Sequence, residues 1–336
     1  MKLSIITINY NNAEGLRKTL ASVASQTYAD IEHVIVDGGS TDGSVEIIRE
    51  YADNEAIRLQ GYTAIRQEKN GKADDALPNR PIASSPHRHE IRWISEPDKG
   101  IYNAMNKGIR MATGEYIEVL NSGDILAVDD VTERMMAALA QQVRGYRLEV
   151  IGNGNSIAEN TALSPNSLIT SSPIENGPAI FYGNMIKVNA QGQVVGKSGY
   201  TEYSLRQFYS STLNHDCAYI RRDLFEEYGL YDENLKIVSD WKWYLQAIGL
   251  GRVKPEYVDI DVTIFDDGGI SETNLALRNA ERRQVLEELL PPAVLWDYDT
   301  HAFEMEQMKR LRRWHLYGLV WFIERVCFKL EKWFRL

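Results

Sequence analysis

The chain has 336 residues, of which 44% are hydrophobic and 25% charged, the composition of a soluble globular protein with a sizeable core. Its net charge of −10 argues against a general nucleic-acid-binding protein, which carries a basic surface. The two cysteines are too few for a disulfide framework and favour a reducing compartment. The N-terminus MKLSIITINY lacks the features of a signal peptide, and no apolar run reaches the roughly 18 residues of a membrane span. We therefore expect a cytoplasmic protein.

The first 125 residues alternate between apolar runs and helical patterns. Continuous apolar runs, typical of parallel strands that are buried on both faces, predict strands at 3–8, 33–36, 91–94 and 116–120. Apolar residues at helical spacing between these runs predict helices at 16–23, 45–51 and 101–111. Repetition of strand and helix at this spacing predicts right-handed crossovers, and therefore an α/β fold with a mostly parallel sheet flanked by helices.

Two polar segments, 54–90 and 152–178, interrupt this rhythm and are rich in Pro and Asn, so we expect surface insertions there. Beyond them the chain again shows strand and helix patterns. The predicted strands are a strand–turn–strand unit at 179–197 and a strand at 253–265, and the predicted helices are at 222–228, 240–248, 275–290 and from about 301 onward. Pro291 and Pro292 end the helix at 275–290.

Polar residues follow each of the first four predicted strands, in the stretches NYNN, DGGSTDGS, SEPDKG and NSGD. Because the carboxyl ends of parallel strands share one edge of a sheet, these loops define the expected ligand crevice. The glycine-rich DGGSTDGS lacks the lysine of a phosphate-binding loop, and its Ser40, Thr41 or Asp42 can instead cap the next helix. Asp37 stands at the strand tip, where its carboxylate could accept hydrogen bonds from a nucleobase or a ribose.

The stretch EYIEVLNSGD ends an apolar strand on Asp124. A turn requires the glycine but not the acid. Asp124 is therefore either the cap of a following helix or a metal ligand at the carboxyl end of a strand.

Several motifs together resemble a family 2 glycosyltransferase with the GT-A fold, of the type that assembles bacterial surface polysaccharides. They are SIITINYNN, SVASQTYADIEHVIVDGGSTDGS, SEPDKGIYNAMNKGIRMATGEYIEVLNSGD, NHDCAYIRRDLFEEYGLYDENLKIVSDWKWYL and FDDGGIS. The resemblance covers about residues 1–125 and resumes at 214–245 and 265–271. It implies a Rossmann-like, mostly parallel sheet flanked by helices and followed by a C-terminal helical extension.

The same resemblance implies two domains. A GT-A-like glycosyltransferase domain would occupy residues 1–270, with its nucleotide-binding half at 1–125 and its acceptor half at 179–270. Residues 271–336 would form a C-terminal helical region.

On the donor side, the resemblance implies that Asp37 binds the nucleobase and that Asn9 and Tyr10 line the base pocket. A tyrosine ring offers a stacking face and a polar tip. Asp98 and Asn106 would reach the ribose or the donor sugar. Because Asn106 lies in the middle of a predicted helix, it can instead be an ordinary solvent-facing side chain.

NSGD stands where the resembled family has its acidic metal motif. Asp124 matches the last acid and would bind Mg²⁺ or Mn²⁺, hard cations that take oxygen ligands and share them with nucleotide phosphates. Asn121 replaces the first acid of the motif, and its amide oxygen can coordinate a cation without adding charge.

Asp240, in VSDWKW, matches the proposed catalytic base. An inverting transferase needs a carboxylate that takes the proton of the acceptor hydroxyl as the new bond forms. Ser239 stands where the family often has a further acid, and Asp240 can instead simply cap its helix. His215 and Asp216 stand where the family often has His-Gln, and would shape the acceptor side.

The C-terminal stretch from Lys309 to the end holds eight Lys or Arg and two Glu, a net charge of +6, together with several aromatic residues. Helices of this composition lie in membrane interfaces, so we expect peripheral contact with the inner face of the cell membrane. The alternatives are that this helix packs on the protein's own core or in a homodimer.

We therefore expect a metal-dependent inverting glycosyltransferase that moves a sugar from a nucleotide-sugar donor, a UDP-sugar, to a glycan or lipid-linked acceptor. A sugar-1-phosphate nucleotidylyltransferase is one alternative, but the first loop NYNNAEG is not the basic, glycine-rich phosphate loop of that class. A non-catalytic sugar-binding or scaffold protein is another, favoured by Asn121 and opposed by the presence of Asp37 and Asp240.

Overall fold

The computed structural model describes residues 1–53, 89–153, 178–189, 192–266, 274–313 and 317–334. These residues form two compact units, Met1–Asn279 and Ala280–Leu336. The expected insertions at 54–90 and 152–178 lie almost entirely outside the described residues, as does most of the FDDGGIS motif.

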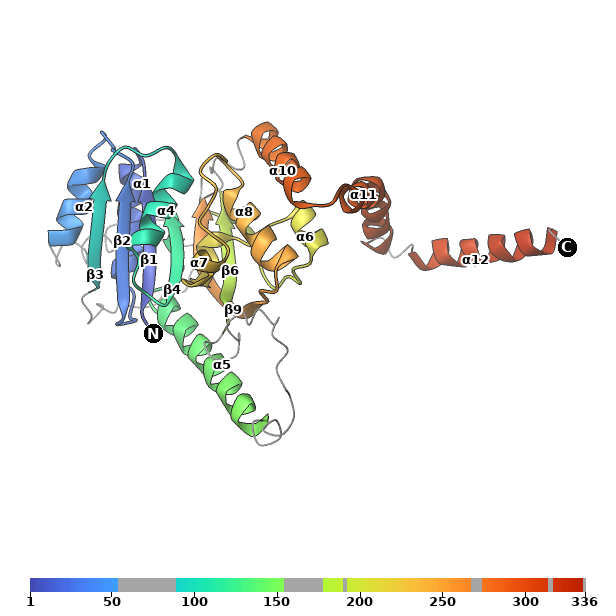
Figure 1. The fold of residues 1–336 in the computed structure, drawn as a ribbon, viewed down its shortest axis with the longest axis horizontal. Coiled ribbons are helices and arrows are strands. Elements are labelled where there is room, and N and C mark those ends of the chain that lie inside the picture. The colour runs from blue at the N-terminus through green and yellow to red at the C-terminus, as the bar shows by residue number, and fades with distance from the viewer. Residues whose placement is uncertain (54–88, 154–177, 190–191, 267–273, 314–316, 335–336) are drawn as a thin grey trace, which may run out of the picture. The chain divides into compact units, whose positions relative to one another are not determined.

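Four parallel strands form one half of the sheet in the first unit, in the order β3-β2-β1-β4 (Figure 1). They are β1 Leu3–Asn9, β2 Ile31–Asp37, β3 Glu90–Ser95 and β4 Tyr116–Asn121. Every residue of β1 and β2 is buried, as continuous apolar runs predict for strands covered on both faces. The four predicted strands and their parallel arrangement are confirmed.

Helices flank these strands as predicted, namely α1 Ala13–Ala24, α2 Ser44–Asp53 and α4 Ile101–Met111. The start of α1 is set by Asn12, whose side-chain oxygen accepts a hydrogen bond from the Gly15 backbone N–H at 3.1 Å. Leu16 and Leu20 of α1 pack with Ile35 of β2 in one buried cluster. The helical spacing of these leucines thus reflects a face that covers the sheet.

The strand register brings the polar strand ends together. Asn9 lies opposite Asp37, Asp37 lies opposite Ser95, and Asn121 pairs with Ile8, the residue before Asn9. The loops that follow these strands therefore emerge at one edge of the sheet, as the sequence predicts.

The other half of the sheet is mixed. Antiparallel β8 joins β4 to β6, and β6 runs parallel to β9, which in turn pairs antiparallel with β5, while β7 pairs with β6. The bounds are β5 Ile125–Leu126, β6 Ile180–Val188, β7 Val194–Lys197, β8 Ala218–Arg221 and β9 Pro255–Asp266. The described residues of the first unit thus contribute nine strands to a single α/β sheet, and the predicted fold class is confirmed.

Five elements of the first unit were not predicted, namely β5, α5 Val131–Asn153, α6 Leu205–Ser210, the short helix η2 His215–Cys217 and β8. Val131, Met135 and Leu139 recur at helical spacing and are fully buried, so α5 carries a pattern that predicts a helix. β8 has four residues and α6 has six, too few for either periodicity to stand out.

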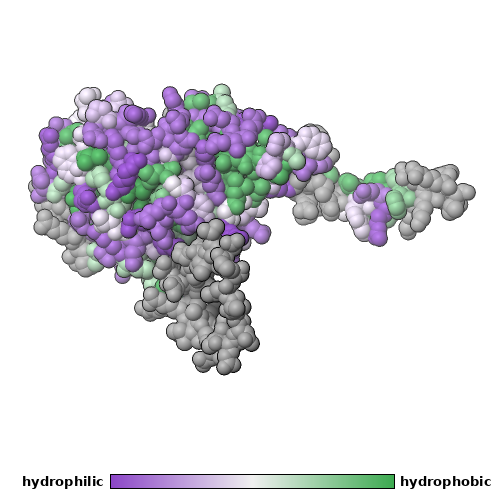
Figure 2. All heavy atoms as spheres, in the orientation of Figure 1, coloured by the Kyte–Doolittle hydropathy of each residue, from purple (hydrophilic) through white to green (hydrophobic). Residues whose placement is uncertain are grey.

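The predicted helix at 222–228 shortens to α7 Leu224–Glu227. The predicted helix at 240–248 is present as α8 Ser239–Tyr244, which continues into a π-helical turn, η3 Leu245–Leu250. Figure 2 shows that hydrophilic residues cover most of the visible surface of the first unit, with hydrophobic patches between them.

α10 Leu275–Leu289 crosses from the first unit into the second, which also holds α11 Pro292–Arg313 and α12 Tyr317–Phe334. The predicted start of the tail helix, about residue 301, is wrong, because α11 begins at Pro292. Proline is favoured at the first position of a helix, where its missing N–H costs no hydrogen bond. No helix among the described residues is long and apolar enough to cross a bilayer.

Candidate active site

Asp37 ends β2 and is completely buried. Its Oδ1 accepts hydrogen bonds from Asn9 Nδ2 at 2.8 Å and Ser40 Oγ at 2.6 Å. Its Oδ2 accepts hydrogen bonds from the backbone N–H groups of Gly39 and Ser40 at 3.2 and 2.9 Å, and from Ser95 Oγ at 2.7 Å. Burial alone would raise the pKa of Asp37, but these hydrogen bonds outweigh it and lower the pKa. The carboxylate thus joins the ends of β1, β2 and β3 from within the protein.

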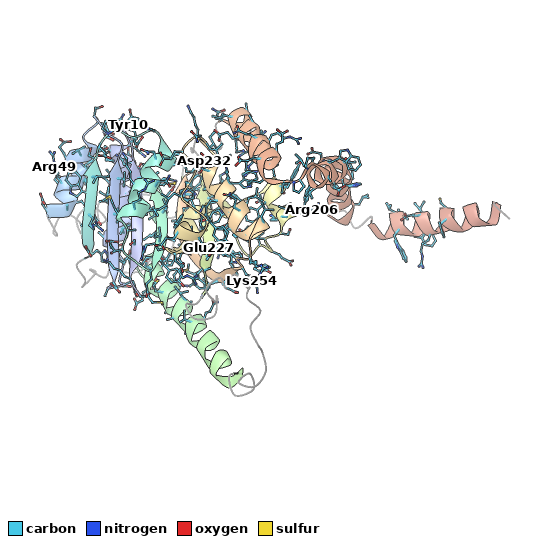
Figure 3. All side chains as sticks on the ribbon, in the orientation of Figure 1. Tyr10, Arg49, Arg206, Glu227, Asp232 and Lys254 are labelled. Carbon is cyan, nitrogen blue, oxygen red and sulfur yellow. The ribbon has the colours of Figure 1, made fainter. Side chains whose placement is uncertain are left out.

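Tyr10 and Asp98 meet at Gly38, the residue that follows Asp37. Tyr10 is 64% exposed and follows the end of β1 (Figure 3). A methyl group at Gly38 would collide with Oδ2 of Asp98 and would come within 3.2 Å of the Tyr10 ring. The glycine therefore lets a carboxylate and an aromatic ring meet at the edge. Beside them, Asn9 Oδ1 is buried with no hydrogen-bond partner among the described residues.

Asn106 is buried in α4 and faces a different loop. Its Nδ2 donates to the Tyr231 carbonyl at 2.8 Å and to Glu233 Oε1 at 2.9 Å, and its Oδ1 accepts from the Tyr231 N–H at 3.0 Å. These bonds use both amide hydrogens to hold the loop at 231–233 against α4. The solvent-facing alternative for Asn106 is therefore wrong, and its expected reach toward the ribose or the donor sugar stays a prediction.

Asp240 lies in the first turn of α8 and is held at both carboxyl oxygens. Tyr102 OH donates to Oδ1 at 2.8 Å, and His215 Nδ1 lies 3.2 Å from Oδ2. The N-cap of α8 is Val238, so the alternative that Asp240 merely caps the helix is wrong. Burial opposes ionisation of Asp240, but the hydrogen bond and charge of His215 and the hydrogen bond of Tyr102 lower its pKa. A carboxylate that is ionised at neutral pH can accept a proton.

His215 belongs to the short helix η2 His215–Cys217. Burial alone would lower its pKa, but the hydrogen bond and charge of Asp240, together with the charges of Asp216 and Asp124, raise the pKa to about 9. Its Nε2 lies 3.2 Å from Asn121 Nδ2. His215 thus connects the expected base to the expected metal motif.

Asn121 and Asp124 contact each other directly. Asp124 Oδ2 accepts hydrogen bonds from the Asn121 backbone N–H at 3.2 Å and from its Nδ2 at 3.1 Å. The element after Asp124 is β5, so the helix-capping alternative is wrong. The chain of contacts from Asp124 through Asn121 and His215 reaches Asp240 and ends at Tyr102.

Asp216 is also buried, and its Oδ2 accepts a hydrogen bond from Thr263 Oγ1 at 3.0 Å. Burial raises the pKa of Asp216, although the charge of His215 opposes this. Burial and the charge of Asp216 raise the pKa of Asp124 to about 7. Two neighbouring buried carboxyl groups that resist ionisation form a place where an added positive charge is stabilised.

The Asp124–Asn121 pair fits a hard divalent cation by its oxygen chemistry. Asn121 Oδ1 is buried with no hydrogen-bond partner among the described residues, next to the Asp124 carboxylate. The described part of the chain has no group of three or more His, Cys, Asp or Glu that could hold a metal ion. A cation here would therefore depend on further oxygen ligands, such as those of a nucleotide diphosphate.

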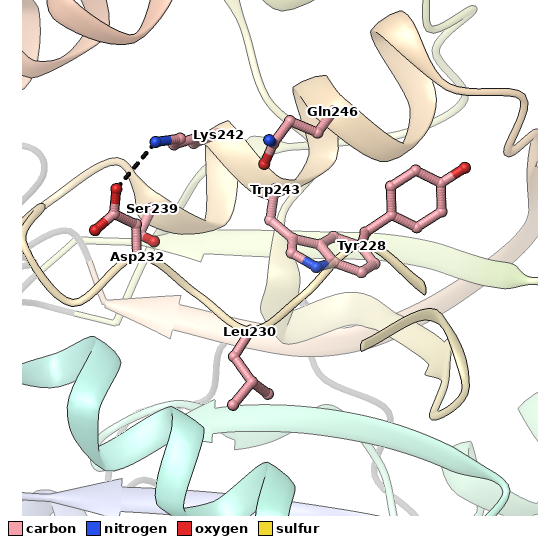
Figure 4. A pocket seen from close by; sticks show the side chains of 7 residues that line it. All are labelled: Tyr228, Leu230, Asp232, Ser239, Lys242, Trp243 and Gln246. Carbon is pink, nitrogen blue, oxygen red and sulfur yellow. Dashed lines mark hydrogen bonds and ion pairs between the residues drawn. The ribbon is translucent and has the colours of Figure 1, made fainter. Parts of the chain in front are cut away.

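A pocket of about 200 Å³ lies beside α8 (Figure 4). Ser239 and Lys242 of α8 line it, and Lys242 Nζ donates to Asp232 Oδ2 at 2.9 Å. Ser239 Oγ, adjacent in sequence to Asp240, is buried with no hydrogen-bond partner among the described residues. The ion pair neutralises the cation of this pocket, so the pocket holds no free charge for a phosphate.

Tyr102 is the main site residue that the sequence did not reveal. It lies on α4, 138 positions before the carboxylate that it contacts. Its helical spacing indicates only that it faces the core, where its ring is indeed buried. A partner for its hydroxyl could be found only from the tertiary structure.

Comparison with known proteins agrees with this geometry. The model of glycosyl transferase family 2 matches residues 4–76. A PGL/p-HBAD biosynthesis glycosyltransferase of Mycobacterium bovis is 24% identical over 271 residues, which are 80% of this chain and 79% of that protein. An uncharacterized glycosyltransferase of Mycobacterium tuberculosis is 31% identical over 139 residues, 41% of this chain and 40% of that protein.

Among solved structures, residues 1–349 of S. aureus TarS in complex with UDP-GlcNAc superpose with a TM-score of 0.51 at 16% sequence identity. The match covers 82% of this chain and 61% of that chain. Another crystal structure of S. aureus TarS gives a TM-score of 0.50, and the match covers 86% of this chain and 42% of that chain.

The sheet and its polar edge define a glycosyltransferase fold of the GT-A type. The family model matches the first strands, and a glycosyltransferase relative aligns along most of the chain, so both comparisons support a family 2 glycosyltransferase.

Proposed function

We propose that the protein transfers a sugar from a UDP-sugar to a glycan or lipid-linked acceptor, with inversion and with the help of Mg²⁺ or Mn²⁺. Residues 1–270 would form the catalytic domain and 271–336 the helical region. The observation that carries the proposal is the continuous set of contacts from Asp124 to Asp240 at the sheet edge. It joins an oxygen-ligand pair for a diphosphate-bound cation to an ionised carboxylate for the acceptor.

On the donor side, Tyr10 stacks on the nucleobase with its exposed ring. Asp98, which approaches Gly38 beside that ring, accepts hydrogen bonds from the ribose or the base. Asp37 acts indirectly, because its carboxylate already holds the loop that presents Gly38. The orphan Oδ1 of Asn9 remains available to a donor N–H or O–H.

The chemical step is a displacement at the anomeric carbon. The acceptor hydroxyl oxygen attacks from the face opposite the diphosphate, its proton moves to the Asp240 carboxylate, and the bond from carbon to diphosphate oxygen breaks with its electron pair. Tyr102 and His215 occupy one position on each oxygen of Asp240, which leaves other lone pairs for the proton. A bound cation would offset charge on the departing diphosphate.

Calorimetric titration of UDP, with and without Mn²⁺, tests the donor and the cation together. We expect Mn²⁺ to strengthen UDP binding in the wild type, and Asp124→Ala to lose that gain because it removes the only carboxylate of the ligand pair. Asp297→Ala is the matched control, because it removes an exposed carboxylate of α11. Equal UDP binding with and without Mn²⁺ would contradict the proposal that a divalent cation takes part. Absence of UDP binding would contradict the proposal that the donor is a UDP-sugar.

The exposed apolar residues of α12 support a membrane surface as the place of the reaction. Its exposed large apolar side chains are Leu319, Val320, Trp321, Phe322, Ile323, Val326 and Phe328. The Arg325 guanidinium lies 4.4 Å from the Trp321 ring centre, which pairs a cation with an aromatic ring as interfacial helices do. We place this helix on the cytoplasmic face of the cell membrane, where a lipid-linked acceptor of surface-polysaccharide assembly would be found.

Sedimentation of the full chain with vesicles tests the membrane contact. Binding to vesicles that contain phosphatidylglycerol should exceed binding to phosphatidylcholine alone, and Trp321→Ser should weaken it. Trp296→Ser is the control, because Trp296 is 63% exposed on α11. Failure to sediment with either vesicle would exclude membrane docking, and a mass in solution of twice the chain would assign α12 to a homodimer.

A further inference from the structure

A second pocket, of about 350 Å³, lies on the acceptor half of the first unit. Its walls come from β6, the end of β7 and the segments on either side of α6. The residues that line it include Tyr182, Thr201, Tyr203, Ser211, Thr212 and Asn214. Hydroxyl and amide groups thus dominate the lining, and the volume falls within the range of about 300–1,000 Å³ for small-molecule sites.

Aromatic rings form one side of this pocket. The Tyr182 ring contacts that of Tyr203, at 5.6 Å between ring centres, and that of Tyr257, at 5.4 Å. Tyr257 in turn contacts Tyr200, which is 69% exposed. A cluster of four tyrosines that reaches the surface offers apolar ring faces together with hydroxyl groups. This combination suits a sugar, which has an apolar C–H face and a polar rim.

The charges around the pocket exclude a phosphate as its preferred ligand. Lys197 is the lining cation, and its Nζ is paired with Asp261 Oδ1 at 2.5 Å. Asp259 lies nearby, where Asn184 Nδ2 donates to both Asp259 and Asp261 at 2.8 and 3.0 Å. A cation already neutralised beside two carboxylates favours a neutral ligand over an anionic one.

The pocket is linked to the catalytic base on two sides. Asn214, which lines it, directly precedes His215, the neighbour of Asp240. Trp241, the residue after Asp240, donates from Nε1 to the carbonyl of Phe208 in α6 at 2.8 Å. The Phe208 ring in turn contacts Tyr203 of the pocket wall, at 5.4 Å between ring centres. The pocket wall and the base are therefore held by the same packed elements.

We infer that this pocket binds a neutral sugar residue of the acceptor, so that the acceptor is a glycan or the glycan part of a glycolipid. The inference rests on the proposed function, since it assigns the pocket to the same transfer reaction. Recognition comes from stacking on the tyrosine cluster and from hydrogen bonds to the Thr, Ser and Asn side chains. The sugar hydroxyl that is glycosylated points toward Asp240.

Two neighbouring serines provide a matched pair of variants. Ser211 lines the pocket and has an extended backbone, so Ser211→Phe fills the pocket without backbone strain. Ser210, the last residue of α6, is exposed and does not line it, so Ser210→Phe adds the same ring outside the pocket. Neither residue belongs to the proposed catalytic or nucleotide-binding groups.

Saturation-transfer NMR with methyl glycosides of common neutral hexoses, in the presence of UDP, tests the inference directly. We expect a signal from at least one glycoside in the wild type and in Ser210→Phe, and its loss in Ser211→Phe. In transfer assays Ser211→Phe should raise the acceptor KM or abolish transfer, while UDP affinity and hydrolysis of the donor sugar stay unchanged.

The outcomes distinguish failure of the acceptor pocket from failure of the proposed UDP-sugar transfer. If UDP binds but no glycoside gives a signal, or if Ser211→Phe leaves the signal unchanged, the acceptor pocket is wrong while the donor assignment stands. A signal from octyl chains of octyl glucoside without one from methyl glucoside would assign the pocket to a lipid tail and overturn the inference. Absence of UDP binding would instead overturn the proposed function.

Discussion

Glu32 and Asp37 lie on β2, whereas Glu118 lies on β4, Asp124 in the turn after β4 and Asp216 in η2. All five carboxyl groups are buried. On β2 each acid is surrounded by donors. Glu32 accepts hydrogen bonds from Ser4, Thr113 and Arg92, and Asp37 is likewise hydrogen-bonded at both oxygens. Burial opposes ionisation at both sites, yet the hydrogen bonds lower both pKa values.

The acids beyond β2 show the opposite behaviour. Burial, with the charge of Asp216, raises the pKa of Glu118 well above its usual range, and the hydroxyl of Tyr219 opposes this only in part. Burial also raises the pKa values of Asp124 and Asp216. Asp240 is the exception, because His215 and Tyr102 hold it in its ionised form.

The two groups of buried acids therefore differ in how far the protein itself stabilises their ionised forms. The donors around Glu32 and Asp37 fix β2 and the segments bonded to it in one geometry before any ligand arrives. Glu118, Asp124 and Asp216 have fewer donors around them, so burial disfavours their ionised forms until a positive charge binds nearby. Asp240, the proposed base, is held in its ionised form by the hydrogen bonds of His215 and Tyr102.

Asp240→Asn is the sharpest test of that exception. An amide cannot take the acceptor proton, so we expect sugar transfer to fall by about 10²–10⁴-fold while UDP affinity changes little. Initial rates with a saturating donor, together with calorimetry of UDP, measure the two effects separately.

Asp232→Asn is the control for this variant, because it neutralises an acid that pairs with Lys242 of the same helix α8 but does not contact Asp240. It should retain most of the transfer activity. If Asp240→Asn also keeps more than about a tenth of the wild-type rate, the carboxylate is not the general base.

Asp37→Ala tests whether the nucleotide-binding half is preformed. The change leaves the donors of Asn9, Ser40 and Ser95 without their common acceptor, so we expect the free energy of unfolding to fall by about 2–4 kcal/mol. Urea unfolding monitored by circular dichroism measures it.

Asp42→Ala is the matched comparison in the same loop. Asp42 is exposed and its Oδ1 accepts hydrogen bonds from Ser44 at the start of α2, so its loss should lower the free energy of unfolding less than Asp37→Ala does. A loss of UDP binding in Asp37→Ala without a loss of stability would restore Asp37 as a direct ligand of the nucleobase.

The sequence predicts the nucleotide-binding half well and the site only in part, for a physical reason. Apolar runs that end in polar residues locate β1 to β4 and place Asp37 and Asp124 at one edge. The same patterns do not say what fills the space around a carboxylate. The donors that enclose Asp37 come from three strand ends and a loop, and Asn106 meets a backbone segment 125 residues away. Hydrogen bonds between residues so far apart in the sequence depend on the tertiary structure, so local periodicity cannot predict them.

Glu118→Gln tests whether the carboxyl group on β4 is uncharged in the folded protein, and it has the smallest expected effect. Because the pKa of Glu118 is raised in the folded state, the native protein keeps a proton that the unfolded chain releases above about pH 4.3. The wild type therefore loses stability as the pH rises from that value toward the folded-state pKa. Glutamine has no proton to lose, so the variant should be more stable than the wild type at pH 8, by about 1–2 kcal/mol, and this advantage should shrink toward pH 4.5.

Urea unfolding of both proteins at the two pH values measures this difference. Glu115→Gln, one residue before β4 and exposed, serves as the control and should show no such pH-dependent gain. An equal stability of Glu118→Gln and the wild type at both pH values would mean that Glu118 is ionised and paired in the folded protein. The contrast between β2 and β4 would then fail, because the proposed cation site at Asp124 requires nearby buried acids whose charge is not already compensated by their own surroundings.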